Sequence, residues 1–166
     1  LLFYSRNGNP NQHWLEEKVA SLYGAKDTII LASGVGALHA LFWTLLKTGD
    51  HVVYPKVSYM AVYRLFHELF NRKFGVKTEM ADMTDLEAVK KAITPGTRLV
   101  HIETPDNPTN HVSDIAEIAR IAHENGALLS VDNTFASPYN QHPLELGADF
   151  VVDSLTKFVN GHGDAQ

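Results

Sequence analysis

The residues best suited to chemistry lie late in the chain, where one lysine is flanked by hydroxyl groups and glycines. Ser154 and Thr156 precede Lys157, and Gly161 and Gly163 follow it. A lysine held at the end of a rigid strand can form a Schiff base with a carbonyl cofactor. The two hydroxyls are placed to bind an anionic group beside it. Because most lysines near strand ends are solvated surface groups, this segment needs support from residues elsewhere.

Asp132 offers such support, because it ends an apolar run and is followed by Asn133 and Thr134. One interpretation is a turn in which the carboxylate binds its own backbone. The other starts from burial: a carboxylate at the end of a buried strand needs a cationic or hydrogen-bonding partner. A pyridinium nitrogen meets that need, and the carboxylate would keep the nitrogen protonated as part of an electron sink.

Two further stretches carry groups suited to a flat, anionic cofactor. Ser33 and Gly34 precede a helix, where backbone N–H groups and the helix dipole favour an anion, although this piece alone is better explained as a simple cap. It is neither a Walker A nor a dinucleotide motif. Tyr59 is either a core aromatic or a ring that stacks on a planar ligand, worth about 0.5–1.5 kcal/mol beyond area burial. Together, these features match a site for pyridoxal phosphate: a lysine for the Schiff base, an aspartate for the ring nitrogen, a tyrosine to stack on the ring and a helix start for the phosphate.

Alternating helices and strands must position these residues. Helices are predicted over 14–22, 34–47, 59–72, 84–94 and 113–125, and strands over 28–32, 51–54, 76–80, 99–102, 128–131 and 150–152. Since the strands are nearly continuously apolar, the predicted fold class is α/β, with a mostly parallel sheet covered by helices on both faces. Ligands bind outside the carboxyl ends of such strands. The candidates near those ends are Gly34, Tyr59, Asn107, Asp132 and Lys157.

Composition narrows the class of protein. The 166 residues are 45% hydrophobic, which fits one domain or part of a larger one. A net charge of −5 without a basic cluster argues against nucleic-acid binding. With no cysteine, disulfides, thiolate zinc sites and cysteine nucleophiles are excluded. No apolar run reaches membrane-spanning length, so no membrane partner is expected. The absence of disulfides is compatible with a reducing cytosol, and a cytoplasmic protein is expected. From its ends at Leu1 and Gln166, we expect a piece of a longer protein.

Seven stretches of the chain, in order, resemble a known family. They are 4–6 with 8–10, 33–34, 49–51, 63–66, 103–109, 131–138 and 154–157. They resemble the pyridoxal-phosphate enzymes of cysteine and methionine metabolism, such as cystathionine γ-lyase, cystathionine γ-synthase and methionine γ-lyase. The resemblance implies that residues 1–166 are the large cofactor-binding domain of a fold-type I pyridoxal-phosphate enzyme, without its carboxy-terminal domain.

The resemblance also implies a role for each matching residue. Lys157 would be the Schiff-base lysine and proton carrier, Asp132 would pair with the ring nitrogen, and Asn107 would lie near the phenolic oxygen. Tyr59 would stack on the ring and assist proton transfer. The remaining cofactor-binding residues would be Gly34, Val35, Thr134, Ser154 and Thr156, most of them on the phosphate. Tyr4 and Arg6 would reach the phosphate of a neighbouring subunit, which implies a homo-oligomer, a dimer or tetramer with shared sites.

The predicted activity is γ-elimination on a small sulfur-containing amino acid such as cystathionine or methionine. Residues 132–138 and 161–164 resemble the γ-lyase branch slightly more than the γ-replacing enzymes, cystathionine γ-synthase and O-acylhomoserine sulfhydrylase. Residues 60–62 are bulkier than in most family members, and Ala61 stands where many methionine γ-lyases have cysteine. In the family, an arginine of the carboxy-terminal domain binds the substrate carboxylate. An inactive cofactor-domain fragment is therefore the other alternative.

Two alternatives come from other classes of enzyme. Ser154 and Lys157 match the S-x-x-K motif of penicillin-recognising enzymes, and residues 47–49 match their K-T-G, although here K-T-G comes first and Ser-Asp-Asn is missing. The histidine-glutamate pairs at His67 and His123 lack the second histidine of an H-E-x-x-H helix. We therefore predict no metal site.

Overall fold

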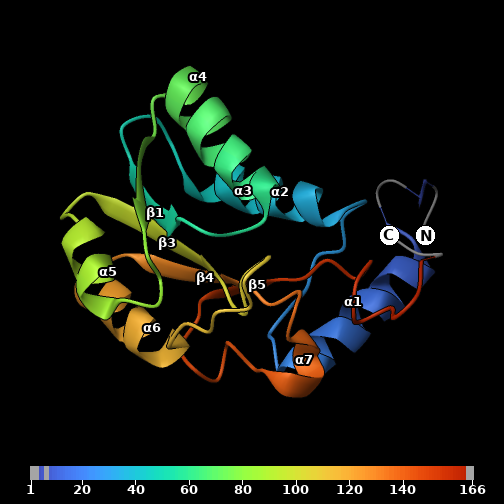
Figure 1. The fold of residues 1–166 in the computed structure, drawn as a ribbon. Coiled ribbons are helices and arrows are strands. Elements are labelled where there is room, and N and C mark those ends of the chain that lie inside the picture. Colours follow the sequence, from blue (N-terminus) through green and yellow to red (C-terminus); the bar gives the residue numbers. More distant parts are fainter. Residues whose placement is uncertain (1–3, 6–7, 164–166) are drawn as a thin grey trace.

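The computed structural model describes residues 4–5 and 8–163 (Figure 1). The elements, in chain order, are α1 (Pro10–Tyr23), α2 (Gly34–Leu45), β1 (His51–Pro55), α3 (Met60–Tyr63), the π-helix η2 (Arg64–Asn71), α4 (Arg72–Phe74), β2 (Lys77–Ala81), α5 (Leu86–Ala92), β3 (Thr97–Glu103), α6 (Ile115–Glu124), β4 (Leu128–Asp132), α7 (Ser137–Asn140) and β5 (Phe150–Val152). Five strands form one parallel sheet in the order β2-β1-β3-β4-β5. The predicted α/β class with a parallel sheet is confirmed.

Each face of the sheet has its own apolar core, because successive strand residues point to opposite faces. The first, the α5–α6 core, combines those two helices with Val53, Val100, Ile102, Leu129 and Val131. The second, the α2–η2 core, joins α2 and the π-helix through residues that include Leu38, Phe42, Val52, Tyr54, Phe66, Phe70, Leu99 and Val152. Figure 1 shows α5 and α6 on the opposite side of the sheet from α2, α3 and α4. Helices therefore cover both faces, as predicted.

The predicted helix over 59–72 is present, but its middle is π-helical. α3, η2 and α4 follow one another without a break until Gly75, whose φ of 67° ends the run. Phe66 packs on Phe42 and on Tyr54, with ring centroids 4.3 and 5.0 Å apart. π-helical turns occur often at functional sites, and this one begins at Arg64, within the continuous helical run that starts just after Tyr59.

The prediction of a buried strand over residues 28–32 is wrong. Ile29 is 76% exposed, and the segment pairs with none of the described strands. Its backbone bonds the side chains of α1 instead: Ile30 N donates to Glu16 Oε1 at 3.2 Å, and Gln12 Nε2 donates to Ile30 O at 3.5 Å. An apolar run predicts strand character, but it does not show whether a neighbouring edge exists to complete the hydrogen bonds. The segment borders a cavity of ≈ 660 Å³ between α1, α2 and β5.

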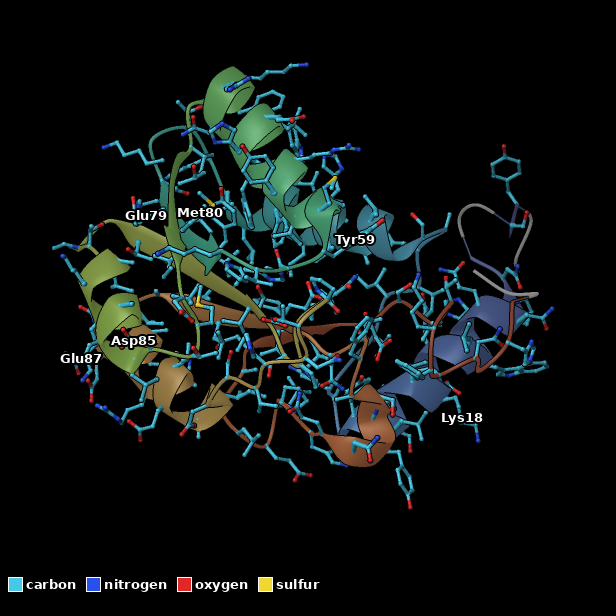
Figure 2. The ribbon with its side chains drawn as sticks, viewed as in Figure 1. Lys18, Tyr59, Glu79, Met80, Asp85 and Glu87 are labelled. Carbon is cyan, nitrogen blue, oxygen red and sulfur yellow. The ribbon has the colours of Figure 1, made fainter. Side chains whose placement is uncertain are left out.

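Smaller differences concern an edge strand and a short helix. β2 is not continuously apolar, because it lies at the sheet edge and exposes Glu79 and Met80 (Figure 2). The short helix α7 has no counterpart among the predicted elements. No helix within residues 4–5 and 8–163 has the length and apolar character needed to cross a bilayer.

Candidate functional site

Two carboxylates stand side by side at the carboxyl ends of the central strands. Glu103 ends β3 and Asp132 ends β4, and the two residues are partners in the β3–β4 register. Just beyond the end of β5 comes the segment from Ser154 to Lys157. The carboxyl edge of a parallel sheet is where ligands bind in open α/β folds, so this edge is the candidate site.

Asp132 is almost fully buried without a matching cation. Its side chain is 6% exposed, and none of the ion pairs among the described residues involves it. Burial raises the pKa of Asp132, while hydrogen bonds from Thr134 and the positive charge of Lys157 act in the opposite direction. The Thr134 N–H donates to Oδ1 at 3.1 Å, so the turn interpretation holds. Because the charge still lacks a close cation, the interpretation as a partner for a cationic ligand is compatible with this geometry and stays a prediction.

The start of α2 lies against the segment that carries Lys157. A Cβ built on Gly34 would stand 2.9 Å from Ser154 Cβ, so only glycine permits this close approach. Ser154 N donates to Thr134 Oγ1 at 2.9 Å, which ties the same segment to the loop after β4. Ser33 caps the helix by accepting from Gly36 N at 3.0 Å. The first N–H groups of a helix have no partner within it, and here they begin beside Ser154.

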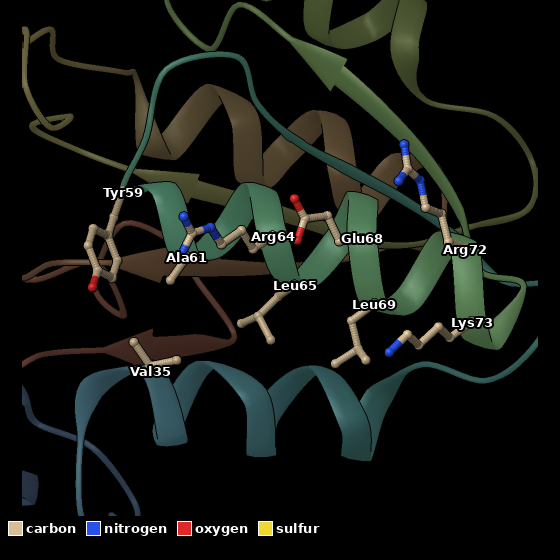
Figure 3. Close-up of a pocket in the computed structure, with 9 residues that line it drawn as sticks. All are labelled: Val35, Tyr59, Ala61, Arg64, Leu65, Glu68, Leu69, Arg72 and Lys73. Carbon is tan, nitrogen blue, oxygen red and sulfur yellow. The ribbon is translucent and has the colours of Figure 1, made fainter.

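Tyr59 is not a core aromatic, because 45% of it is exposed. It lines a groove of ≈ 700 Å³ between α2 and the π-helix, together with Val35 from the start of α2. Figure 3 shows Tyr59 at one end of this groove and Arg72 and Lys73 at the other. The other lining residues are Ala61, Arg64, Leu65, Glu68 and Leu69. The groove thus brings together two of the predicted cofactor residues and keeps the tyrosine ring accessible.

The backbone of Tyr59 is joined to that of Asn107 through Glu103, a residue to which sequence reasoning assigned no role. Both N–H groups donate to its carboxylate. The rule that selected Asp132, a charged residue at the end of a buried strand, applies equally to Glu103. Glu103 could therefore have been selected from the sequence by the same rule.

A buried polar network, also missed from the sequence, supports the segment before Lys157. Tyr23 Oη donates to Asp153 Oδ2 at 2.5 Å, and Asn133 Nδ2 donates to Tyr23 Oη at 2.9 Å. Gln141 Nε2 in turn donates to Asn133 Oδ1 at 2.7 Å. Burial raises the pKa of Asp153 to about 6. The network fixes α1, the loop after β4 and the residue preceding Ser154 to one another.

The remaining predicted site residues are Lys157, Thr156, Tyr4 and Arg6. Lys157 is exposed in a turn whose backbone bonds run from Lys157 N to Ser154 O at 3.0 Å and from Gly161 N to Lys157 O at 2.8 Å. Thr156 is partly buried beside it. Tyr4 is exposed, Arg6 lies outside the described residues, and a single chain does not test their expected contact with a neighbouring subunit.

The alternative enzyme classes find no support in this geometry. Residues 47–49 precede β1 at the amino edge of the parallel sheet, whereas Ser154 follows the carboxyl end of β5. The S-x-x-K and K-T-G stretches therefore lie at opposite edges. Among residues 4–5 and 8–163, no three histidines and carboxylates come together as a metal site.

Comparison with known proteins also indicates a pyridoxal-phosphate enzyme. A family model described as Cys/Met metabolism PLP-dependent enzyme matches residues 2–166. Canavanine γ-lyase from Rhizobium leguminosarum is 49% identical over 162 residues, covering 98% of this chain and 40% of the relative. L-methionine γ-lyase from Pseudomonas putida is 48% identical over 162 residues, with the same coverage.

A solved structure agrees closely with the fold. The crystal structure of MetB from Corynebacterium glutamicum matches with a TM-score of 0.94 at 44% identity, over 98% of this chain and 42% of that one. The chain thus spans about two-fifths of the length of the relatives it matches. The chain belongs to the family of pyridoxal-phosphate-dependent enzymes of cysteine and methionine metabolism.

Proposed function

We propose that the protein carrying this chain catalyses pyridoxal-phosphate-dependent γ-elimination on a small sulfur-containing amino acid. The observation that carries the proposal is the buried Asp132 carboxylate, which lacks a close cation and feels the charge of Lys157 at the carboxyl edge of the sheet. A pyridinium N–H is a cationic donor of the kind that such a carboxylate requires.

The residues present fit this cofactor in a second respect. The start of α2 approaches Ser154 so closely that Gly34 admits no side chain. A helix start provides free N–H groups and a favourable dipole for a phosphate. We assign phosphate binding to Gly34, Val35, Ser154 and Thr156. Thr134 positions Ser154 by accepting its N–H at 2.9 Å.

The chemistry is divided between the cofactor and the chain. When bound, the cofactor withdraws electrons from the substrate carbon that loses a proton. Lys157 would hold the cofactor covalently, and its amine, once displaced by the amine of the substrate, would carry protons to and from the substrate carbons. Asp132 would hold the proton on the ring nitrogen through its charge. Tyr59 would cover the ring with its exposed side chain, and Asn107 would meet the phenolic oxygen.

The relatives support the reaction class more firmly than the choice of substrate. Their names include canavanine and L-methionine γ-lyases, a probable cystathionine γ-synthase and a cystathionine β-lyase. γ-Replacement is therefore the second candidate function, favoured by the 47% identity to the probable γ-synthase over 161 residues. Residues 60–62, which follow Tyr59 at the groove, are where we expect the two reactions to be distinguished.

Three parts of the proposal concern the whole protein. We propose a homo-oligomer, dimer or tetramer, in which Tyr4 and Arg6 reach the phosphate of a neighbouring subunit. The bidentate fork of an arginine suits phosphate oxygens. The cytoplasmic location stays a prediction. Since the chain spans about two-fifths of its relatives' length, a cofactor-binding unit without turnover of its own is the alternative for residues 1–166 taken alone.

Borohydride reduction tests the central assignment. The protein is mixed with pyridoxal 5′-phosphate, reduced, digested and mapped by mass spectrometry. We expect a single adduct on Lys157, its loss in Lys157→Ala, and an unchanged adduct in Lys77→Ala, which alters an exposed lysine on the edge strand β2. A reducible adduct in Lys157→Ala, or adducts scattered over surface lysines, would contradict the assignment. Turnover by residues 1–166 compared with the full-length protein then separates an active unit from a binding unit.

A further inference from the structure

Glu103 is a buried carboxylate to which the proposed chemistry gives no role. It is 5% exposed, and none of the ion pairs among the described residues involves it. Its neighbour across the β3–β4 register is the carboxylate of Asp132, so the nearest strand presents a like charge. A buried carboxylate in such surroundings is costly to keep. Its hydrogen bonds must therefore account for its presence.

The carboxylate of Glu103 accepts one hydrogen bond on each oxygen, from two different parts of the chain. The Tyr59 N–H donates to Oε2 at 2.6 Å, and the Asn107 N–H donates to Oε1 at 2.9 Å. Tyr59 follows β1 and stands 44 residues away in sequence, whereas Asn107 lies in the loop after β3. One rigid, planar group thus sets the separation of two backbone segments.

Only a carboxylate can make both bonds at this position. Each of its oxygens is an acceptor, whereas glutamine would turn an NH₂ donor toward one of the two N–H groups. Bonds from neutral donors to a charged acceptor are also stronger than neutral ones. Burial is the main cause that raises the pKa of Glu103 to about 7, with Asp132 adding to it, while the bonds from Tyr59 and Asn107 lower it. The two N–H groups therefore favour the ionised form that binds them.

The two residues joined in this way are those that the proposed function places on the cofactor ring. Tyr59 would cover its face and Asn107 would meet its phenolic oxygen. We propose that Glu103 is a positioning residue, which holds Tyr59 and Asn107 at a fixed separation so that the ring enters a preformed slot. This inference rests on the proposed function, because it requires the ring to lie between those residues.

An isosteric variant of the full-length protein tests the inference. In Glu103→Gln, Lys157 should still take the borohydride-reducible adduct, while the Kd for pyridoxal 5′-phosphate rises about tenfold or more, as expected for the loss of a bond to a charged group. The visible circular-dichroism band of the bound cofactor should weaken, because Tyr59 is no longer held.

The matched control is Asp106→Asn in the same loop. Asp106 Oδ1 accepts from Thr109 Oγ1 at 2.5 Å and from His111 N at 3.1 Å, and neither of these bonds involves Tyr59. The control should keep the wild-type Kd and dichroism. An unchanged Kd and dichroism in Glu103→Gln would overturn the inference, as would an equal loss in Asp106→Asn, since the effect would then belong to the loop as a whole.

The wild-type protein supplies a test that needs no variant. Without cofactor, hydrogen–deuterium exchange should be slow at the amides of both Tyr59 and Asn107, because the carboxylate holds them before any ligand binds. Fast exchange at either amide would overturn the inference. Failure of the proposed function looks different: wild-type protein would then take no adduct at Lys157. An adduct on Lys157 with a Glu103→Gln variant like wild type would reject the positioning role alone.

Discussion

The two faces of the central sheet are built from the same strands but carry different chemistry. On β3, Val100 and Ile102 enter the α5–α6 core, while His101 and Glu103 point to the other face. On β4, Leu129 and Val131 enter the α5–α6 core, while Ser130 bonds His101 at 2.9 Å on the opposite face. Asp132, two residues beyond Ser130, shares that face.

The difference teaches where a parallel sheet can accept charge. On the α5–α6 face, the side chains that β3 and β4 contribute to the core are all apolar. The other face is apolar near the aromatic rings of α2 and η2 but ends in two carboxylates beside the carboxyl edge. Burial raises the pKa of both groups, so keeping the two carboxylates ionised on this face costs stability. The predictions below test that division, from the largest effect to the smallest.

Adding a carboxylate one residue before Asp132 should have the largest effect. Val131→Asp places a charge in the α5–α6 core, where an uncompensated buried charge costs about 3–5 kcal/mol of unfolding free energy. Val131→Thr keeps the shape and should cost about 1–3 kcal/mol for its hydroxyl group. Urea denaturation of both variants gives the comparison. Equal midpoints for Val131→Asp and wild type would show that this face does tolerate charge.

The pH dependence of stability should come next. Folding raises the pKa of Glu103 from 4.5 to about 7 and that of Asp153 from 3.8 to about 6. A raised carboxyl pKa means that the folded state binds its proton more tightly, so stability is highest at low pH and falls as the pH rises through the folded pKa. Each group should cost the cofactor-free protein about 3 kcal/mol over this window.

The measurement is the free energy of unfolding from pH 4 to pH 8 for wild type, Glu103→Gln and Asp153→Asn. Each variant should remove its own share of the decline. If the difference between wild type and Glu103→Gln stayed constant over this range, burial of the ionised carboxylate would carry no cost.

Asp132→Asn should separate chemistry from folding. The amide keeps the shape, so the protein folds, but the ring nitrogen loses its counter-charge. Since an opposite charge shifts a pKa by about 1–3 units, kcat/KM should fall by about 10- to 1,000-fold at saturating cofactor. Asp85→Asn is the control, because Asp85 caps α5 far from the site and asparagine caps equally well. Full activity in Asp132→Asn would refute its pairing with the ring.

Ile102→Val should have the smallest effect. It removes one methylene from the α5–α6 core and should cost about 0.5–1.5 kcal/mol of unfolding free energy. Because Ile102 points away from the site, kcat/KM should remain at the wild-type value. A loss of activity larger than the loss of stability would mean that the two faces are coupled.

Much of the fold could be predicted because strands buried on both faces are recognisable from their residues alone. β3 and β4 read as nearly continuous apolar runs, and their alternation with helices along the chain leaves few alternatives to a parallel sheet. Residues 28–32 read the same way and are not a strand. An apolar run indicates that a segment prefers to be buried. To form a strand, the segment must also find the edge of a neighbouring strand, which another part of the chain contributes.

The site could be predicted from the sequence only where the type and position of a single residue imply that it requires a partner. Asp132 was found because a charge at a strand end requires a partner. The partners of Glu103 and Asp153 were not predictable, because they are backbone groups and a tyrosine brought close only by folding. Tyr23 and Asp153 are 130 residues apart in sequence. The π-helical form of residues 64–71 was not predicted either, and two of its residues, Phe66 and Phe70, pack against Phe42 of α2.

The hydrogen bond between Tyr23 and Asp153 also means that, during synthesis on the ribosome, one partner is made long before the other. A chain grows at about 5–20 residues per second, so α1 waits roughly 7–26 s after its own synthesis before the residue that anchors Tyr23 is made. Lys157 follows four residues later. The segment that carries Lys157 is therefore made only after the first strands, so the nascent chain cannot bind its cofactor through this lysine while those strands assemble.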